Sequence, residues 1–477
     1  MKKILLSLCT LVGTLAFAQQ NKEYKTQYST NAINLYSQDI NSGNAKYIGV
    51  GGAVGALGSD ITSVEQNPAG LGVAINSDVQ VTAGVSTFSN KTNFGTNIKQ
   101  SDNNFDFQQF GGTFVFANEA SKWNRFTIGV AYLNQRLDNY SSIGTNEGIK
   151  FADPDGTFNG YLKDIDGYKS KFSVNLGTSY DDKVYLGFGL NFHETNYSGY
   201  EQYAERDDNN NQTYVYNANG APFREIGQGF SFSLGAIYKV NHNVRLGAAY
   251  HSPVWYNVAE DFYSAKNSFD YDKRTADTYY MYSSDYDMTR GGRFVGSLGF
   301  VVGKNLSIGA DYTYHMNNDT KLKPTQYFNG DNNFINDFVK NSNEVRVGTE
   351  YRIDRFKVRA GYNYITSPYK DFNTSKVLNT EFRDENNVPQ NINLKNAFAG
   401  DINRVSFGLG YDFGGFYIDA AYQYQTQKYQ QLIGGTNFVD PNYDEKLQGY
   451  YFVSLPSYSP KVKLDNNLFL LTLGWQF

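Results

Sequence analysis

The amino-acid sequence predicts an all-β fold: a transmembrane antiparallel β-barrel of about 14 strands with a short helical or irregular segment inside it. Three observations lead to this prediction. From residue 77 onward, polar and apolar residues alternate in segment after segment, as in strands with two different faces. The chain carries 40 Tyr, 35 Phe and 46 Gly, and its connections are alternately short and long. These features are typical of membrane barrels, whose outer face is apolar only at every second residue.

The first 18 residues are expected to be an export signal. Lys2 and Lys3 precede an apolar run over residues 4–17, and Ala16-Phe17-Ala18 is a small-residue cleavage site. The single cysteine, Cys9, lies within this signal. We therefore expect a mature chain without disulfides, thiolate metal sites or cysteine nucleophiles.

Residues 19–76 are expected to form a hatch or plug ahead of a barrel that spans residues 77–477. The stretch 45–76 is rich in Gly and Ala, which lets backbone pack closely against backbone, as in a confined segment. Ser59 or Asp60 is expected to cap a short helical turn, with Glu65 within reach of its start. Pro68 should force Asn67 into an extended conformation and end that turn.

The alternation predicts fourteen strands, and the connections between them sort into two kinds. Short turns are expected near residues 181–182, 241–242, 303–304, 354 and 414. Long polar loops are expected over 139–168, 198–225, 258–287, 318–341, 367–400 and 430–461. This sorting matches an outer-membrane barrel with periplasmic turns and external loops. The strands are expected near 77–89, 105–117, 124–138, 169–180, 182–197, 226–239, 243–257, 288–302, 304–317, 342–353, 355–366, 401–413, 415–429 and 462–477.

The last predicted strand carries apolar residues on one parity only: Phe469, Leu471, Leu473, Trp475 and Phe477. An open edge in lipid would leave N–H and C=O groups unpaired, so this strand is expected to pair with the first and close the barrel. A terminal Phe after alternating aromatics also resembles the signal that barrel-assembly machinery reads. The expected location is the outer membrane of a Gram-negative bacterium, with its lipid and that machinery as partners.

The hatch region resembles that of a known family. The run Gly49-Val50-Gly51-Gly52-Ala53, then Ser59-Asp60, then Asn67-Pro68-Ala69-Gly70-Leu71 directly before the first strand is similar to the N-terminal hatch of the FadL/TodX family. That family comprises outer-membrane transporters for long-chain fatty acids and aromatic hydrocarbons, with a fourteen-stranded barrel, an NPA motif in the hatch and a terminal Phe.

The resemblance implies a transport route. An apolar ligand would be captured at the external loops, pass to an apolar pocket in the lumen, and leave sideways through a gap at a kinked strand as the hatch moves. The sequence departs from the family in loops 139–168 and 198–225, which are rich in Asp, Asn and Gly. The segment Asn67, Pro68, Ala69, Gly70 and Leu71 is interpreted either as a gating element or as a structural stop.

Several charged residues are predicted to face the lumen. Arg245, Arg346 and Arg359 are the candidates for binding the carboxylate of a ligand. The alternative is that lumen charges pair with one another or with the plug. The full set on this parity is Arg245, Asp311, Arg346, Glu350, Arg359, Asp412 and Asp419.

Other chemistry has little support in the sequence. His193, His251 and His315 fall on separate strands, so no metal site is predicted from them. Asp153, Asp155, Asp164 and Asp166 either hold Ca²⁺ in an outer loop or serve turn formation. No nucleophile motif is present, so neither an enzyme nor a cofactor is predicted. The net charge of −5 disfavours nucleic acid as a partner.

The sequence therefore favours one function and leaves two others open. The favoured function is passive uptake of hydrophobic small molecules, such as long-chain fatty acids or aromatic hydrocarbons, through a plugged barrel. The first alternative is a structural or assembly barrel associated with protein secretion. The second is a general porin.

Overall fold

A computed structural model of the 477-residue chain gives the fold. It describes residues 27–94, 98–118, 120–137, 139–147, 156–217, 223–265, 269–270, 275–276, 279–373, 382–383, 389–390, 393–431, 437–439, 452–454 and 459–477. The predicted export signal and the candidate calcium ligands Asp153 and Asp155 lie outside these residues.

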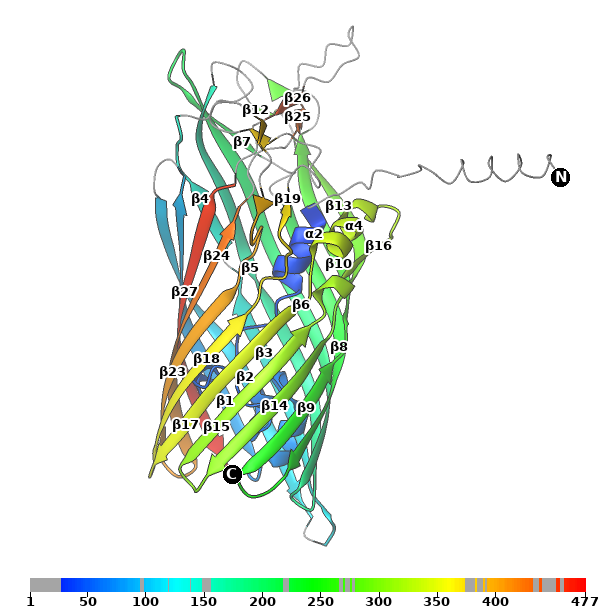
Figure 1. Ribbon diagram of the computed structural model, residues 1–477, viewed down its shortest axis with the longest axis vertical. Helices are drawn as coiled ribbons and strands as arrows, with labels where there is room; N and C mark the ends of the chain where they lie inside the picture. Colours follow the sequence, from blue (N-terminus) through cyan, green and yellow to red (C-terminus); the bar gives the residue numbers. More distant parts are fainter. Residues whose placement is uncertain are drawn as a thin grey trace, which may run out of the picture.

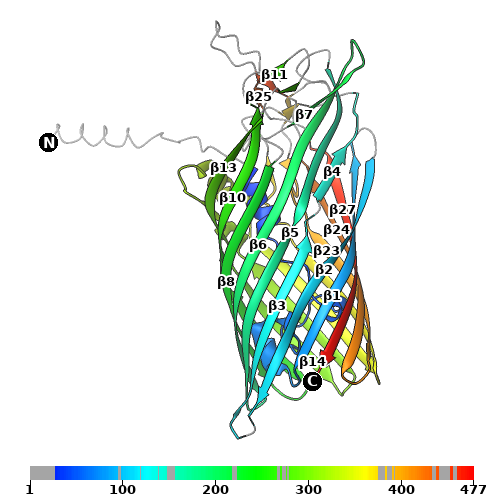
Figure 2. The same ribbon diagram turned by 180° about the vertical axis from the view of Figure 1, so that it is seen from behind.

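In the described residues, fourteen antiparallel strands close into one barrel, which confirms the predicted fold class and strand number (Figure 1, Figure 2). The last strand pairs with the first along its whole length, from Asp78 with Gln476 to Asn93 with Lys461. The barrel strands are β1 Asp78–Asn93, β2 Ile98–Ala117, β3 Trp123–Arg136, β5 Gly156–Tyr180, β6 Val184–Asp207, β8 Phe223–Lys239, β9 Val244–His251 continued by β10 Val254–Ala265, β13 Tyr279–Arg290 continued by β14 Arg293–Val302, β15 Leu306–His315, β17 Ser342–Ile353, β18 Phe356–Ile365, β23 Ile402–Asp412, β24 Phe416–Gln430 and β27 Lys461–Gln476.

The remaining elements lie ahead of β1 or in the long connections. The helical elements are α2 Gln27–Asn31, η1 Ala32–Tyr36, α3 Ala45–Gly49, η2 Ile61–Glu65, η3 Pro68–Val73, η4 Asn317–Asp319 and α4 Asn329–Phe338. The short strands are β4 Asn139–Ile143, β7 Thr213–Asn217, β11 Phe269–Asp270, β12 Thr275–Ala276, β16 Lys321–Lys323, β19 Phe372–Asn373, β20 Phe382–Arg383, β21 Pro389–Gln390, β22 Asn393–Leu394, β25 Asn437–Val439 and β26 Phe452–Ser454.

Barrel strands extend into three of the predicted loops. β5 and β6 extend far into the predicted loops 139–168 and 198–225, and β10 and β13 extend into 258–287. In these extensions apolar residues such as Phe158, Tyr161 and Ile165 stand at irregular spacing among polar and charged ones. The segments therefore lack the regular alternation from which strands are recognised. The predicted loop 318–341 also contains a helix, α4, whose Phe334 and Ile335 are fully buried.

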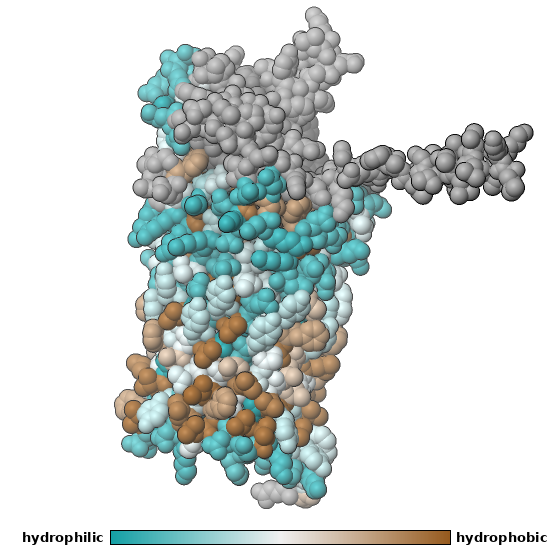
Figure 3. Space-filling model, in the orientation of Figure 1, coloured by the Kyte–Doolittle hydropathy of each residue, from teal (hydrophilic) through white to brown (hydrophobic). Residues whose placement is uncertain are grey.

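The barrel wall has an apolar outer face and a polar inner face. On β14, Phe294, Leu298 and Phe300 are exposed, whereas the intervening Ser297 is buried. Apolar residues gather over the lower part of the strands in Figure 3, and a polar band lies above them. We call the end with the short turns and Phe477 the turn end, and the opposite end the loop end. No helix in the described part of the chain is long and apolar enough to cross a lipid bilayer.

Residues 27–76 lie inside the barrel, and we call them the lumen segment. α3 contacts β23 and β24 on one side, while η3 contacts β5, β6 and β8 on another. In Figure 1 this blue segment runs from α2 near the loop end down to the turn end. The segment therefore touches the wall along much of the height of the lumen.

Candidate functional site

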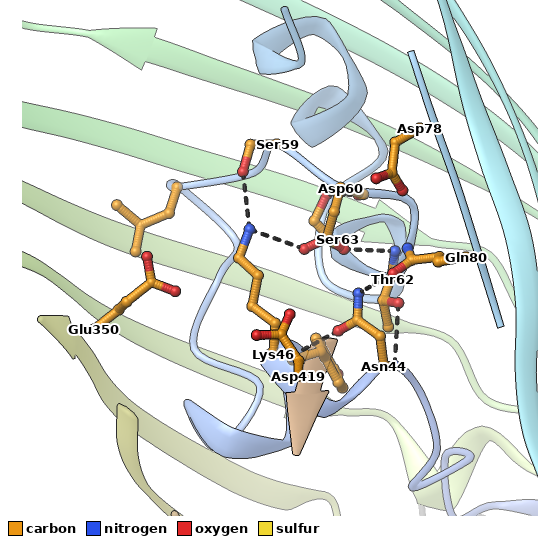
Figure 4. A network of polar contacts seen from close by, with 12 residues as sticks. Asn44, Lys46, Ser59, Asp60, Thr62, Ser63, Asp78, Gln80, Glu350 and Asp419 are labelled. Carbon is orange, nitrogen blue, oxygen red and sulfur yellow. Dashed lines mark hydrogen bonds and ion pairs between the residues drawn. The ribbon is translucent and has the colours of Figure 1, made fainter. Parts of the chain in front are cut away.

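The lower part of the lumen segment is held by a polar network around Asn44 (Figure 4). The Asn44 side chain caps α3, because its Oδ1 accepts from the Tyr47 backbone N–H at 2.7 Å. Its Nδ2 donates to Oε1 of Gln80 on β1 at 2.9 Å. One side chain thus ends a helix and ties it to the first strand.

Asp60 is the second centre of this network. It is the one of the two predicted capping residues that caps η2, accepting from the Thr62 N–H at 2.8 Å. Its other oxygen lies 3.1 Å from the amino group of Lys46, which also contacts Ser59 at 3.2 Å. Burial alone would lower the pKa of Lys46, but the Asp60 and Glu350 carboxylates nearby raise it above its usual value. Lys46 therefore stays charged and joins α3 to η2.

Asn67 links the lumen segment to the wall. Its backbone is extended, as predicted, and its Oδ1 caps η3 by accepting from the Ala69 N–H at 3.0 Å. Its Nδ2 donates to two carbonyls, that of Gly55 at 2.9 Å and that of Ala236 on β8 at 3.1 Å. Pro68 begins η3, so it starts a new turn besides following the end of η2.

The rest of the motif packs against the wall. Ala69 and Leu71 are fully buried, and Leu71 belongs to an apolar cluster with Ile61 and with Ala131 on β3. The Gly70 carbonyl accepts from the Ser59 N–H at 3.0 Å. The motif is thus a structural junction; its gating role stays a prediction.

A belt of glycines on the inner wall seats the lumen segment. A Cβ placed on most of these glycines would approach atoms of the segment to within 3.0 Å, closer than real Cβ atoms come. At Gly187 it would meet the Pro68–Ala69 peptide, at Gly309 the Ala53 carbonyl and at Gly361 the Gly51 N–H. Glycine is required here because backbone lies directly on backbone. The belt comprises Gly129, Gly177, Gly187, Gly235, Gly247, Gly299, Gly309, Gly348, Gly361 and Gly408, on ten neighbouring strands.

The three candidate arginines point inward, and each has partners within the protein. Arg359 is fully buried and bonds Glu350 at 2.7 Å and Asp419 at 2.6 Å. The alternative, pairing among lumen charges, thus describes Nε and Nη1 of Arg359, while its Nη2 is buried without a hydrogen-bond partner among the described residues. Its role in carboxylate binding stays a prediction.

Arg346 and Arg245 contact the lumen segment directly. Arg346 pairs with Glu344 at 2.6 Å and also bonds the Gln66 side chain. Arg245 donates to the Leu57 carbonyl at 2.9 Å. Both arginines therefore hold the segment, and their predicted role in ligand binding is not tested by these contacts.

Above the belt the lumen becomes a chamber with an excess of positive charge. Asp39 of the lumen segment pairs with Arg290 and Arg293, which flank it on β13 and β14. The described residues of this chamber include six buried cations, Lys169, Lys171, Arg290, Arg293, Arg346 and Arg404, and three carboxylates, Asp39, Glu65 and Glu344.

Two of these cations have no carboxylate at ion-pair distance within the described part of the chain. Lys169 donates to the carbonyls of Leu35 and Gln38. Arg404 donates to Gln425 at 2.7 Å and to Asn363 at 3.1 Å. Sequence parity alone does not single out either residue. What distinguishes them is that their direct cross-strand partners are uncharged: Gln135 and Thr195 for Lys169, and Asn363 and Gln425 for Arg404.

The chamber is almost filled. The cavity within it has a volume of about 60 Å³, enough for roughly two waters at ~30 Å³ each. It is lined by polar groups such as Asp39, His315, Glu344 and Arg404. The resemblance implies an apolar pocket in the lumen, and this cavity is a polar one, so the apolar pocket stays a prediction.

An apolar cluster lies on the loop-end side of the chamber. It combines η1 residues such as Ile33 and Tyr36 with Phe334 of α4 and Tyr369, all fully buried. Polar contacts join the same parts: the Tyr36 hydroxyl donates to Glu225 at 2.6 Å, and the Ser29 N–H donates to Asp331 at 2.9 Å. The first described helical turns of the chain therefore help to close the chamber on its loop-end side.

Two neighbouring wall strands are interrupted at one level. β9 ends at His251 and β10 begins at Val254; β13 ends at Arg290 and β14 begins at Arg293. The registers on both sides agree, His251 facing Arg293 and Val254 facing Arg290, so residues 252–253 lie opposite 291–292. The sequence predicted two continuous strands here; Pro253 cannot donate to the ladder, and Gly291 and Gly292 favour a bend.

The predicted closure residues lie on β27, except Phe477, which directly follows it. Phe469, Leu471, Trp475 and Phe477 are exposed, and Leu473 is partly exposed. Their role in assembly stays a prediction. In the described ranges, no group of three or more His, Cys, Asp or Glu residues is placed to hold a metal ion.

Solved structures share this architecture. A Pseudomonas aeruginosa FadL homologue superposes with a TM-score of 0.55 at 15% identity, over 92% of this chain and 99% of the other. The Pseudomonas putida toluene transporter TodX gives 0.54 at 12% identity, over 92% and 100%. The chain has the FadL/TodX barrel fold. The monoaromatic hydrocarbon channel CymD also matches, with a TM-score of 0.51 at 12% identity over 91% and 97%.

These FadL-type structures support the resemblance seen in the sequence at the level of the fold. Of these proteins, TodX is named as a toluene transporter and CymD as a monoaromatic hydrocarbon channel. No family model and no curated protein matches the sequence.

Proposed function

We propose that this protein is an outer-membrane transporter for passive uptake of hydrophobic small molecules, such as long-chain fatty acids or aromatic hydrocarbons. The observation that carries the proposal is an excess of buried cations directly above a segment that fills the lumen. A ligand with an acidic head and an apolar tail would supply the missing charge, because buried cations bind carboxylates through charge-assisted hydrogen bonds. Lys169 and Arg404 are the proposed head-group residues.

Transport in this proposal requires the lumen segment to move. A cavity of about 60 Å³ is far below the ~300 Å³ or more of a typical small-molecule site. The ligand carboxylate would compete with Asp39 for the chamber cations and so loosen the upper part of the segment. No cofactor and no energy source are part of this mechanism.

We propose that the ligand leaves sideways where the wall strands are interrupted. Trp255 on β10 and Thr289 on β13 are cross-strand partners next to the interruption, so the variant W255C/T289C would lock the two strands together there with a disulfide. The proposed mature chain has no other cysteine. Oxidation should stop uptake but leave binding unchanged, and reduction should restore uptake; undisturbed uptake by the oxidised protein would refute this exit.

Binding of a labelled long-chain fatty acid to the purified protein tests the main proposal. The variant K169M/R404Q should bind the fatty acid at least tenfold more weakly, since each lost charged hydrogen bond is worth about 1.5–3 kcal/mol. The control K183M/R355Q removes two exposed charges at the turn end and should bind as the wild type does. Melting temperatures of all three proteins establish that each is folded.

The same samples separate the alternatives. If the folded wild type shows no saturable binding, a structural or secretion-associated barrel becomes the better interpretation. If liposomes containing the protein swell in small sugars at porin rates, the lumen is open and a general porin is the better interpretation.

A further inference from the structure

Six lysines gather on the wall near the loop end, around a cleft of about 740 Å³. Five of them are exposed, and Lys463 is partly exposed. We call this group the lysine face. It consists of Lys91, Lys99, Lys395, Lys428, Lys461 and Lys463.

Four of these lysines form a continuous row across four strands that lie side by side (Figure 2). Lys91 on β1 is the direct cross-strand partner of Lys99 on β2 and of Lys463 on β27. Lys463 is in turn the partner of Lys428 on β24. Direct partners share a face of the sheet, so the four side chains stand next to one another.

The row lies on the outer face of the barrel. It has the parity of Val85 on β1, Phe105 on β2 and Phe469 on β27, all of which are exposed. The lysines therefore point away from the lumen and away from the proposed transport path.

The row lacks the opposite charges found elsewhere on the wall. Lys323 on β16 faces Asp287, and Lys163 on β5 faces Glu201. In the lysine face only Lys463 has a carboxylate partner within the described residues, Asp465 at 2.7 Å. Like charges placed directly opposite each other destabilise a sheet. We therefore expect an anion from outside the chain to stabilise the four strands that carry the lysine row.

The distance of the lysine row from the apolar zone of the wall indicates which kind of anion it can reach. On β1, β2 and β27 the lysine lies six positions beyond the last apolar outward residue, as Lys91 does beyond Val85. Six residues at ~3.3 Å and a strand tilt of about 40° place the lysines roughly 15 Å above the apolar zone. A phospholipid headgroup layer is only about 5–8 Å thick, whereas a lipid with a phosphorylated sugar core carries anions further out.

We infer that the lysine face binds the phosphorylated sugar core of an outer-leaflet glycolipid, the chemistry of lipopolysaccharide. Several ammonium groups on one face suit several phosphates, because each lysine acts as a flexible point charge. The inference rests on the proposed outer-membrane location and does not depend on what the barrel transports.

Binding of fluorescent lipopolysaccharide to the purified full-length protein in detergent tests this inference. The variant K91Q/K428Q/K461Q should bind about tenfold more weakly or worse, since each lysine near an anionic lipid surface contributes substantially. The control K122Q/K183Q/K304Q removes the same charge from exposed turn-end lysines and should stay within twofold of the wild type. The variant K91R/K428R/K461R keeps the charge and should retain binding.

Three results would overturn the inference. The first is an equal loss of lipopolysaccharide binding in the lysine-face and turn-end glutamine variants, because it would indicate unspecific attraction between positive charge and the glycolipid. The second is equally tight binding of lipid A that lacks the sugar core, and the third is full displacement by millimolar inorganic phosphate. The melting temperatures of the variants in detergent without glycolipid show whether each one is folded. Because the substitutions remove like charges that face each other, the lysine-face variant should be at least as stable as the wild type.

Discussion

The two halves of the lumen hold the same segment by different means. Toward the turn end, inward positions are glycines, and the backbone of residues 49–72 lies directly on the wall. Toward the loop end, inward positions are long charged side chains that reach Asp39 and its neighbours. On β17 the change takes only two residues, from Gly348 to Arg346.

The difference shows how one half of the lumen segment can stay fixed to the wall while the other half is released. Contact between backbones depends on shape, and no soluble ligand can compete with it. An ion pair can be replaced by another anion of the right charge. We therefore expect the loop-end half of the segment, held by a few pairs such as Asp39 with Arg293, to be the part that responds to a ligand.

The substitution Asp39→Asn should produce the largest effect. It leaves Arg290 and Arg293 without their shared carboxylate, and breaking a buried pair in this way costs about 3–5 kcal/mol. Hydrogen exchange should accelerate in residues 27–41 and remain slow in residues 49–72. The control Asp166→Asn breaks the exposed pair with Arg136 and should cost under about 1 kcal/mol.

Leu473→Arg tests whether inner and outer faces are assigned correctly, on which the comparison depends. Leu473 faces outward, with Val81 as its cross-strand partner. An arginine facing lipid near the bilayer midplane should cost about 2–4 kcal/mol, and one near the interface about 0–1 kcal/mol. Folding titrations in lipid should show the larger loss for Leu473→Arg and the smaller one for Asn467→Arg, further along β27. Equal stabilities would mean that the parity is reversed.

The fold was predictable from the sequence because lipid and lumen impose opposite demands on successive residues. The alternation is clear on strands such as β15 and β27, and there the predicted boundaries agree with the structure within two residues. It fails on the loop-end parts of β5 and β6, where apolar residues such as Phe158 and Ile165 follow no regular spacing. Those parts of the two strands are recognised only in the structure, through the backbone hydrogen bonds between them.

The site was predictable only where sequence neighbours decide it. Parity placed Arg359 inside, and its partner Glu350 could have been found from the tight turn at Asp354, which makes the two residues cross-strand partners. The contact of Asp39 with Arg290 joins residues 251 positions apart. No local pattern reports such a contact.

Gly187→Val tests the turn-end half of the comparison. The new side chain would meet the Pro68–Ala69 peptide, and overpacking of this kind costs about 1–3 kcal/mol. The lumen segment should be pushed off its seat, so liposomes containing the variant should swell faster in small sugars. Gly296→Val is the matched control, because a Cβ there has nothing within 4 Å. Unchanged swelling of both variants would show that the belt does not seal the lumen.

The Asn67 side chain both caps η3 and bonds the wall, and its substitution should have the smallest effect. Asn67→Ala removes both the cap of η3 and the bonds to Gly55 and Ala236, and loss of a cap costs about 0.5–2 kcal/mol. Asn67→Asp keeps the capping oxygen but loses the two donated bonds, so it separates capping from wall attachment. If wall attachment matters for sealing, both variants should raise sugar permeability; if only Asn67→Ala does so, the residue acts as a structural stop and not as a gate.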